Sequence, residues 1–164
     1  MKPLSIALAA LITFFSITAF AQSDAQKSFE KLKTLAGTWE GKGIKGEPLQ
    51  VTFRMTSNGS AIMSEIQGPE DMISMFHLDG DRLLMTHYCS AGNQPRMVGK
   101  MAPDGKSVTF DFLDVTNFTS SQPGHMQHVV LTMLDANHHT EDWDFMDRDG
   151  QQHEHERLDL QRTK

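Results

Sequence analysis

The chain is poor in the residues that build covalent or catalytic centres. Its 164 residues include one cysteine, Cys89, one tyrosine and two tryptophans. A single cysteine excludes an internal disulfide, so stability must come from the apolar core. The sequence has no Gly-x-Ser-x-Gly, His-Glu-x-x-His, Cys-x-x-Cys-His or glycine-rich phosphate-binding motif. These absences favour a binding protein over an enzyme without deciding between them.

Positive charge is also scarce. Fifteen Lys and Arg residues face 21 Asp and Glu residues, for a formal net charge of −6. Nucleic acids and anionic membrane surfaces recruit proteins through basic patches, so this balance disfavours both as partners.

The one long apolar run lies at residues 4–20, behind Lys2 and before the small-x-small sequence Ala19-Phe20-Ala21. This pattern predicts a signal peptide over residues 1–21, cleaved near Ala21, and a periplasmic or secreted location. The run is short for a bilayer span and no basic patch follows it, so we expect no membrane anchor. Residues 22–164 have the length of one domain.

A short helix opens this domain. Ser23 can cap it, with Gln26 three residues later as in a capping box, and Phe29 and Leu32 recur at helical spacing before Gly37 ends the helix. The remaining sequence alternates with period two, which predicts ten strands at about 38–45, 49–56, 60–67, 71–78, 82–90, 95–102, 106–114, 126–135, 138–147 and 151–161.

Short turns connect these strands, and several contain glycine where a positive φ is needed, as in 57–59, 78–80, 103–105 and 148–150. Neighbouring strands should therefore pair as an antiparallel meander. The fold class predicted is an all-β, ten-stranded barrel with the helix plugging one end, because closure removes the edges that ten short strands would expose.

The segment Gly37-Thr38-Trp39-Glu40-Gly41-Lys42-Gly43, at the head of such a meander, resembles the calycin superfamily, which includes lipocalins, fatty-acid-binding proteins and ten-stranded nitrobindins. The segments 77–82 and 86–89 also resemble a group of exported bacterial proteins of unknown function. The resemblance implies a small-molecule binder in which Trp39 packs under Arg157 of the last strand. It also implies that haem, where bound, is held by a histidine near the C-terminus, here His153 or His155.

The alternation of turns predicts which end of the barrel is open. The helix and the mostly tight turns at 57–59, 79–80, 103–105 and 136–137 share one end. The connections at 46–48, 68–70, 91–94, 115–125 and 148–150 share the other, which includes the two longest loops and is therefore the predicted mouth. Five of the eight histidines fall on this rim: His87, His125, His128, His153 and His155.

Side-chain parity predicts which residues face inward. A three-residue turn with a glycine bulge at 148–150 makes Asp147 oppose Gln151, and the acids of the last two strands then face water. The inner face would carry Trp143, Phe145, His153, His155 and Arg157, and the outer face Asp142, Asp144, Glu154 and Glu156. The same turn at 78–80 would place Ile73, Met75, Leu83, Met85, His87 and Cys89 inside.

Three kinds of ligand suit the predicted mouth. The pairs His153-x-His155 and His87-x-Cys89 project from one face of a strand and could hold a metal such as zinc, if His125, His128 or a carboxylate completed the site. Haem is the second, ahead of zinc.

The third is an apolar molecule such as a fatty acid or isoprenoid. Its walls would be Trp39, Trp143, Phe110, Phe112, Phe145 and the methionines, and its head group would meet Asn93, Gln94, Arg96 or Arg157. We expect a small, largely apolar ligand or haem at the histidine-rich mouth. A metal- or haem-dependent enzyme using the same rim and a barrel that serves as an interaction module are the alternatives.

Overall fold

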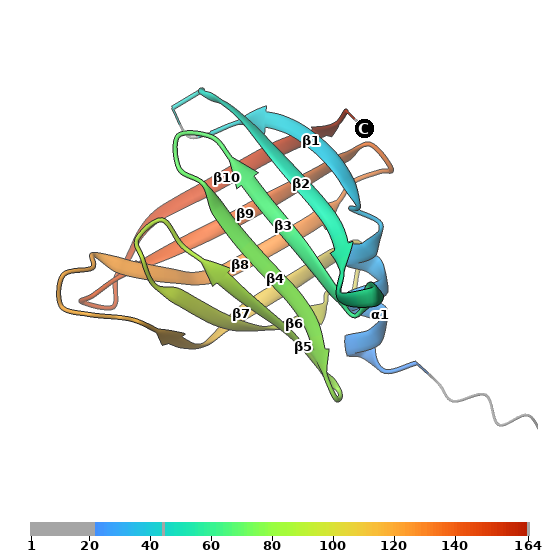
Figure 1. Cartoon of the computed structure of the whole chain (residues 1–164), viewed down its shortest axis with the longest axis horizontal. Coiled ribbons are helices and arrows are strands. Elements are labelled where there is room, and N and C mark those ends of the chain that lie inside the picture. The colour runs from blue at the N-terminus through green and yellow to red at the C-terminus, as the bar shows by residue number, and fades with distance from the viewer. Residues whose placement is uncertain (1–21, 44, 164) are drawn as a thin grey trace, which may run out of the picture.

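The structure, a computed structural model, describes residues 22–43 and 45–163, with the side chains of Gln152 and His153 left undescribed. The predicted signal peptide, residues 1–21, lies outside this part. One helix, one 3-10 turn and ten strands follow in order (Figure 1): α1 Asp24–Lys33, β1 Gly37–Lys42, β2 Pro48–Thr56, η1 Ser57–Gly59, β3 Ala61–Gln67, β4 Met72–Asp79, β5 Arg82–Tyr88, β6 Gln94–Met101, β7 Ser107–Thr116, β8 Gly124–Met133, β9 His138–Asp147 and β10 Gln152–Arg162.

The ten strands form a closed antiparallel barrel in which each strand pairs with its neighbours in sequence and β1 pairs with β10. This confirms the predicted meander, and every strand boundary lies within three residues of its expected position. The regular spacing of the turns made this possible, because each glycine-containing connection marks the end of one strand and the start of the next.

Helix α1 covers one end of the barrel, where it packs against β4, β5 and β6 (Figure 1). Ser23 caps it by accepting a hydrogen bond of 3.2 Å from the backbone N–H of Gln26. Its inward face buries Phe29 and Leu32. The helix ends at Lys33, earlier than expected, and Gly37 instead opens β1 with φ 138°. Within the described residues, no helix combines the length and apolarity needed to cross a membrane.

Arg162 links the first strand, the last strand and the segment that follows the helix. Its guanidinium lies 4.0 Å from the centre of the Trp39 ring and donates hydrogen bonds to the carbonyl oxygens of Thr34 at 2.8 Å and Ala36 at 2.6 Å. Trp39 in turn donates its indole N–H to Leu35 O at 2.8 Å. The arginine that packs on Trp39 is therefore Arg162, and the expected partner, Arg157, was wrong.

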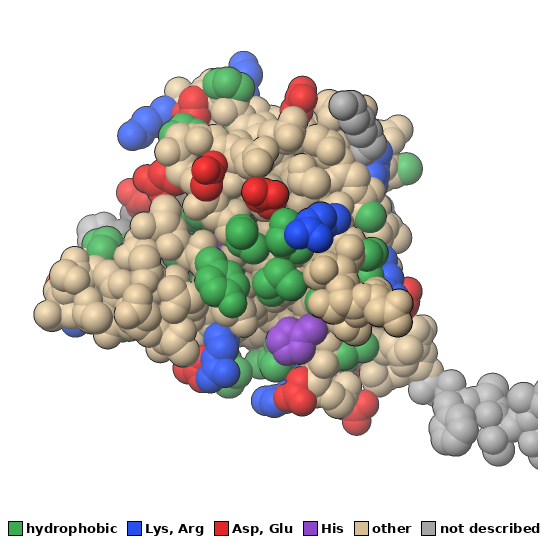
Figure 2. Space-filling model, viewed as in Figure 1, with side chains coloured by type: hydrophobic (Ala, Val, Ile, Leu, Met, Phe, Trp, Pro, Cys, Tyr) green, Lys and Arg blue, Asp and Glu red, His purple; other side chains and the backbone are tan. Residues whose placement is uncertain are grey.

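The β4–β5 hairpin turns through two residues, since Asp79 pairs with Arg82. The predicted three-residue turn was wrong here, and the parity of β4 is reversed. Ser74 and Phe76 face inward, whereas Ile73 is 36% exposed. Figure 2 shows the consequence on the outer surface, where hydrophobic side chains gather over β3, β4 and β5.

We predict that Arg162→Lys lowers the free energy of unfolding by about 2 kcal/mol, because lysine keeps the charge but loses the planar stack on Trp39 and the paired hydrogen bonds. Urea unfolding followed by circular dichroism measures the change. The matched control is Arg157→Lys on the outer surface, where the arginine bonds Asp142 at 3.0 Å and Thr140 at 3.4 Å, and it should change stability by less than about 0.5 kcal/mol. Equal losses in the two variants would contradict the role given to Arg162.

Candidate functional site

The interior of the barrel is divided into a filled half and a hollow half. Next to α1, the rings of Trp39, Phe53, Phe76 and Phe110 pack on one another and on His139, with centroid separations of 4.2 to 6.5 Å. Trp39 and Phe110 therefore fill the closed end, and neither lines the pocket for which they were predicted as walls.

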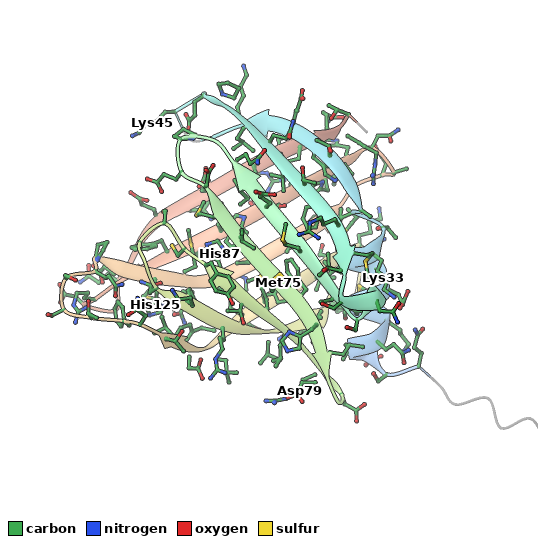
Figure 3. All side chains as sticks on the ribbon, in the orientation of Figure 1. Lys33, Lys45, Met75, Asp79, His87 and His125 are labelled. Carbon is green, nitrogen blue, oxygen red and sulfur yellow. The ribbon has the colours of Figure 1, made fainter. Side chains whose placement is uncertain are left out.

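The opposite half contains a pocket of about 910 Å³. Four of the connections assigned to the mouth contribute to its rim, around residues 45–47, 68–70 and 89–91 and at Pro123, which confirms that this end is open. Figure 3 shows the arrangement, with Lys45, His87 and His125 in the mouth half and Lys33 and Asp79 at the closed end. The apolar lining consists of Leu49, Ile66, Met72, Met126, Trp143, Phe145 and Leu158, together with smaller side chains.

Strand β10 presents Glu154 and Glu156 to this pocket, whereas His155 is not among the residues that line it. The turn before it is as predicted, because Asp147 N donates to Gln151 O at 2.9 Å and Gly150 has φ 77°. The register then shifts between Gln152 and Glu154, so that Glu154 pairs with Phe145 and Glu156 with Trp143. One extra residue reverses every later side chain of a strand.

The bulge corrects four predicted orientations. Glu154 and Glu156 line the pocket, and His155 and Arg157 lie on the outer surface with Asp144 and Asp142. The inward orientations of Trp143 and Phe145 are confirmed. The side chain of His153 lies outside the described residues.

His87 of β5 is the most unusual residue of the lining. It is fully buried, its Nδ1 lies 2.9 Å from Ser74 Oγ, and its ring packs 4.8 Å from that of Trp143. Its Nε2 has no hydrogen-bond partner among the described residues. Burial lowers the pKa of His87 to about 4, so the ring is neutral at pH 7. A neutral imidazole with one tethered nitrogen offers the other nitrogen to whatever fills the pocket.

A buried carboxylate that the sequence analysis did not single out lies next to Trp143, at the inner end of the pocket, which is called its floor below. Glu141 is 1% exposed; one oxygen lies 3.2 Å from His139 Nε2 and the other accepts the indole N–H of Trp143 at 3.0 Å. Glu141 thus fixes the ring that walls the pocket. Its position on the inner face of the ninth strand was the available signal, since it shares the parity of Trp143.

The remaining predicted site residues are spread around the rim and the outer surface. Cys89 lines the pocket, and burial raises the pKa of its thiol. Asn93 is buried and donates to Gly124 O at 2.8 Å, and so ties two loops together. Gln94 bonds Thr116 at 3.1 Å, and Arg96 forms an ion pair with Asp114 on the outer surface.

The two histidines of the long loop region do not line the pocket. His125 stacks on Phe112 with centroids 4.4 Å apart, and His128 lies 3.0 Å from Asp111. On β10, the hydrogen bond with Asp144 raises the pKa of His155. Over the described part of the chain, no three His, Cys, Asp or Glu side chains come together in a way that could hold a metal ion.

The pair Ser74–His87 does not form a nucleophilic centre. Ser74 is 4% exposed and is not among the residues that line the pocket, so its hydroxyl orients the imidazole from behind. A catalytic serine must instead face the substrate with the histidine as its base. The arrangement is a largely apolar pocket whose lining includes one buried imidazole with an unpartnered Nε2.

Comparisons with known proteins support the barrel fold and do not identify a function. No family model and no curated protein matches the sequence. Among solved structures, the crystal structure of Rv2717c from M. tuberculosis is similar, with a TM-score of 0.60 and 12% sequence identity. The match covers 84% of this chain and 98% of that one. At this identity the likeness shows the fold alone.

We predict that His87 makes stability depend on pH. An unfolded histidine has a pKa near 6.5, above the folded value of about 4, so the unfolded state binds the proton first. Stability from neutral His87 is complete above pH 6.5 and falls by about 3 kcal/mol as the pH drops to about 4.

Urea unfolding between pH 4 and pH 8 tests this dependence. The variant His87→Gln should lose most of the pH-dependent difference, whereas His77→Gln, on the outer face of β4, should keep it. A native-like pH profile in His87→Gln would show that another group is responsible.

Proposed function

We propose that this protein binds a small, largely apolar molecule in the pocket at the open end of the barrel. The observation that carries the proposal is His87, which lines the pocket and whose buried Nε2 has no partner among the described residues. Buried polar atoms are almost always hydrogen-bonded, so an unpartnered one in a residue that lines a pocket supports a ligand that bonds it there. A volume of about 910 Å³ falls in the range of small-molecule sites.

The walls support an apolar ligand body. Trp143 and Phe145 form one side on β9, and Leu49 and Ile66 form the other on β2 and β3. Trp143 is held by its hydrogen bond to Glu141, so one wall is fixed before the ligand arrives. A prearranged wall reduces the entropy lost on binding.

The described lining favours a smaller ligand over a haem. The two propionates of a haem are anionic, and the described lining offers Lys45 against Glu47, Glu70, Glu154 and Glu156. His155, one of the two histidines expected to hold the iron, points outward to Asp144 at 2.7 Å. A smaller ligand without carboxylates suits this lining better.

We extend the proposal to the structural superfamily of the protein and to its export. Membership of the calycin superfamily is supported by the Gly-x-Trp segment on the first strand and by the closed ten-stranded meander. Export is supported by the apolar run at residues 4–20 and the small-x-small sequence at residues 19–21.

We predict that the neutral fluorophore N-phenyl-1-naphthylamine binds at one site per chain with a rise in fluorescence, because the pocket removes it from water. The variant Ala91→Trp should weaken binding at least tenfold, since it places a large ring over the pocket from the β5–β6 connection, where Ala91 lines it. Fluorescence titration measures both.

The control is Leu113→Trp, which adds the same ring at a residue that is 44% exposed and does not line the pocket. It should bind the fluorophore as the native chain does. Equal binding by all three proteins would place the fluorophore on the outer surface and remove the support for a functional pocket.

A further inference from the structure

The mouth of the pocket carries an arc of negative charge. Glu154 and Glu156 contribute from β10, Glu47 from the β1–β2 connection and Glu70 from the β3–β4 connection. These segments are neighbours around the barrel, because the strand order runs β10, β1, β2, β3, β4. Four carboxylates therefore occupy one side of the opening, and Lys45 is the one cation in the described lining.

Resting on the binding function proposed above, we propose that the pocket selects molecules whose apolar body carries a protonated amine. The apolar body would occupy the space between Trp143, Phe145 and the aliphatic walls. The ammonium group would remain at the mouth among the glutamates.

Two further observations favour a cationic ligand. Glu47 lines the pocket, and its Oε2 is buried and accepts no hydrogen bond from the described residues. A buried carboxylate oxygen without a donor is unfavourable, and an ammonium N–H would satisfy it. On the floor, His87 Nε2 belongs to a fully buried ring that carries no charge to repel a cation.

The arginines expected to hold an anionic head group are turned away. Arg96 pairs with Asp114 and Arg157 with Asp142, both on the outer surface. A fatty acid would bring its carboxylate to the glutamates, and among the described residues of the lining Lys45 is the cation that opposes the repulsion. The same opening attracts a cation and repels an anion of equal size.

A ligand series with one chain length and three head groups tests the charge preference. Isothermal titration calorimetry at pH 7 with decylamine, 1-decanol and decanoate, each below its micelle concentration, keeps the apolar contribution constant. We expect decylamine to bind at least tenfold more tightly than 1-decanol, and decanoate to bind most weakly. Raising the salt concentration should bring the affinities for decylamine and decanoate closer to that for 1-decanol.

Charge-neutral variants locate the preference. Glu47→Gln/Glu154→Gln should weaken decylamine at least fivefold and leave 1-decanol unchanged. The control Glu30→Gln/Asp81→Asn removes two charges at the closed end, on α1 and in the β4–β5 turn, and should bind all three molecules as the native chain does.

Each outcome separates the two proposals. If 1-decanol and decanoate bind as tightly as decylamine, the amine preference is wrong and the binding function stands. If both double variants lose decylamine equally, net charge and not the mouth is responsible, which also overturns the preference. If none of the three molecules binds, the apolar-pocket function itself fails.

Discussion

The closure of the barrel by the pairing of β1 with β10 is the constraint on which the rest of the structure depends, and Arg162 reinforces it. Its guanidinium lies on Trp39 of β1 while its backbone belongs to β10, and its hydrogen bonds reach Thr34 and Ala36 beyond the end of α1. One side chain thus connects the first strand, the last strand and the helix. Without the pairing of β1 with β10 the sheet would have two unpaired edges, and it would not enclose an interior.

The side chains that fill the closed end of the barrel leave the other end hollow. Ring packing around Trp39, Phe53 and His139 uses the space next to α1, and ten strands enclose more volume than these side chains fill. Glu141 lies on the inner face of β9 between the filled and hollow halves, since it contacts His139 on one side and Trp143 on the other. A carboxylate at 1% exposure is tolerated because both oxygens have partners, and those partners hold the pocket wall in place.

The sequence predicted the strands, their order and the open end well, because these depend on local turn chemistry and on the alternation of turns. It failed on the facing of β4 and β10. At Asp79 the hairpin turns through two residues instead of three, and at Glu154 the register slips by one. Neither difference can be seen in the alternation of apolar and polar residues, because each strand alternates whichever of its two sets of side chains faces inward. The slip at Glu154 also turns Arg157 outward, so the arginine that the resemblance implied is not the one that meets Trp39.

The error at β10 also had a chemical cause. Glu154 and Glu156 were expected on the outer face because burying a carboxylate costs free energy. That reasoning holds for a packed core such as the one around Trp39, but the mouth of a pocket is in contact with water, and Glu154 is exposed there. An inward-facing residue near a rim is therefore not a buried residue.

The consequence extends to ligand class. With the register slip between Gln152 and Glu154, the inward face of β10 is acidic; without it, the inward face would carry His155 and Arg157. A single inserted residue thus exchanges an opening that attracts cations for one that attracts anions, while the barrel stays the same. For this reason the likeness to Rv2717c, at 12% identity, shows the barrel fold and says nothing of a ligand. The ligand has to be inferred from the residues that this chain itself presents to the pocket, and those are carboxylates around an apolar wall with one neutral imidazole on the floor.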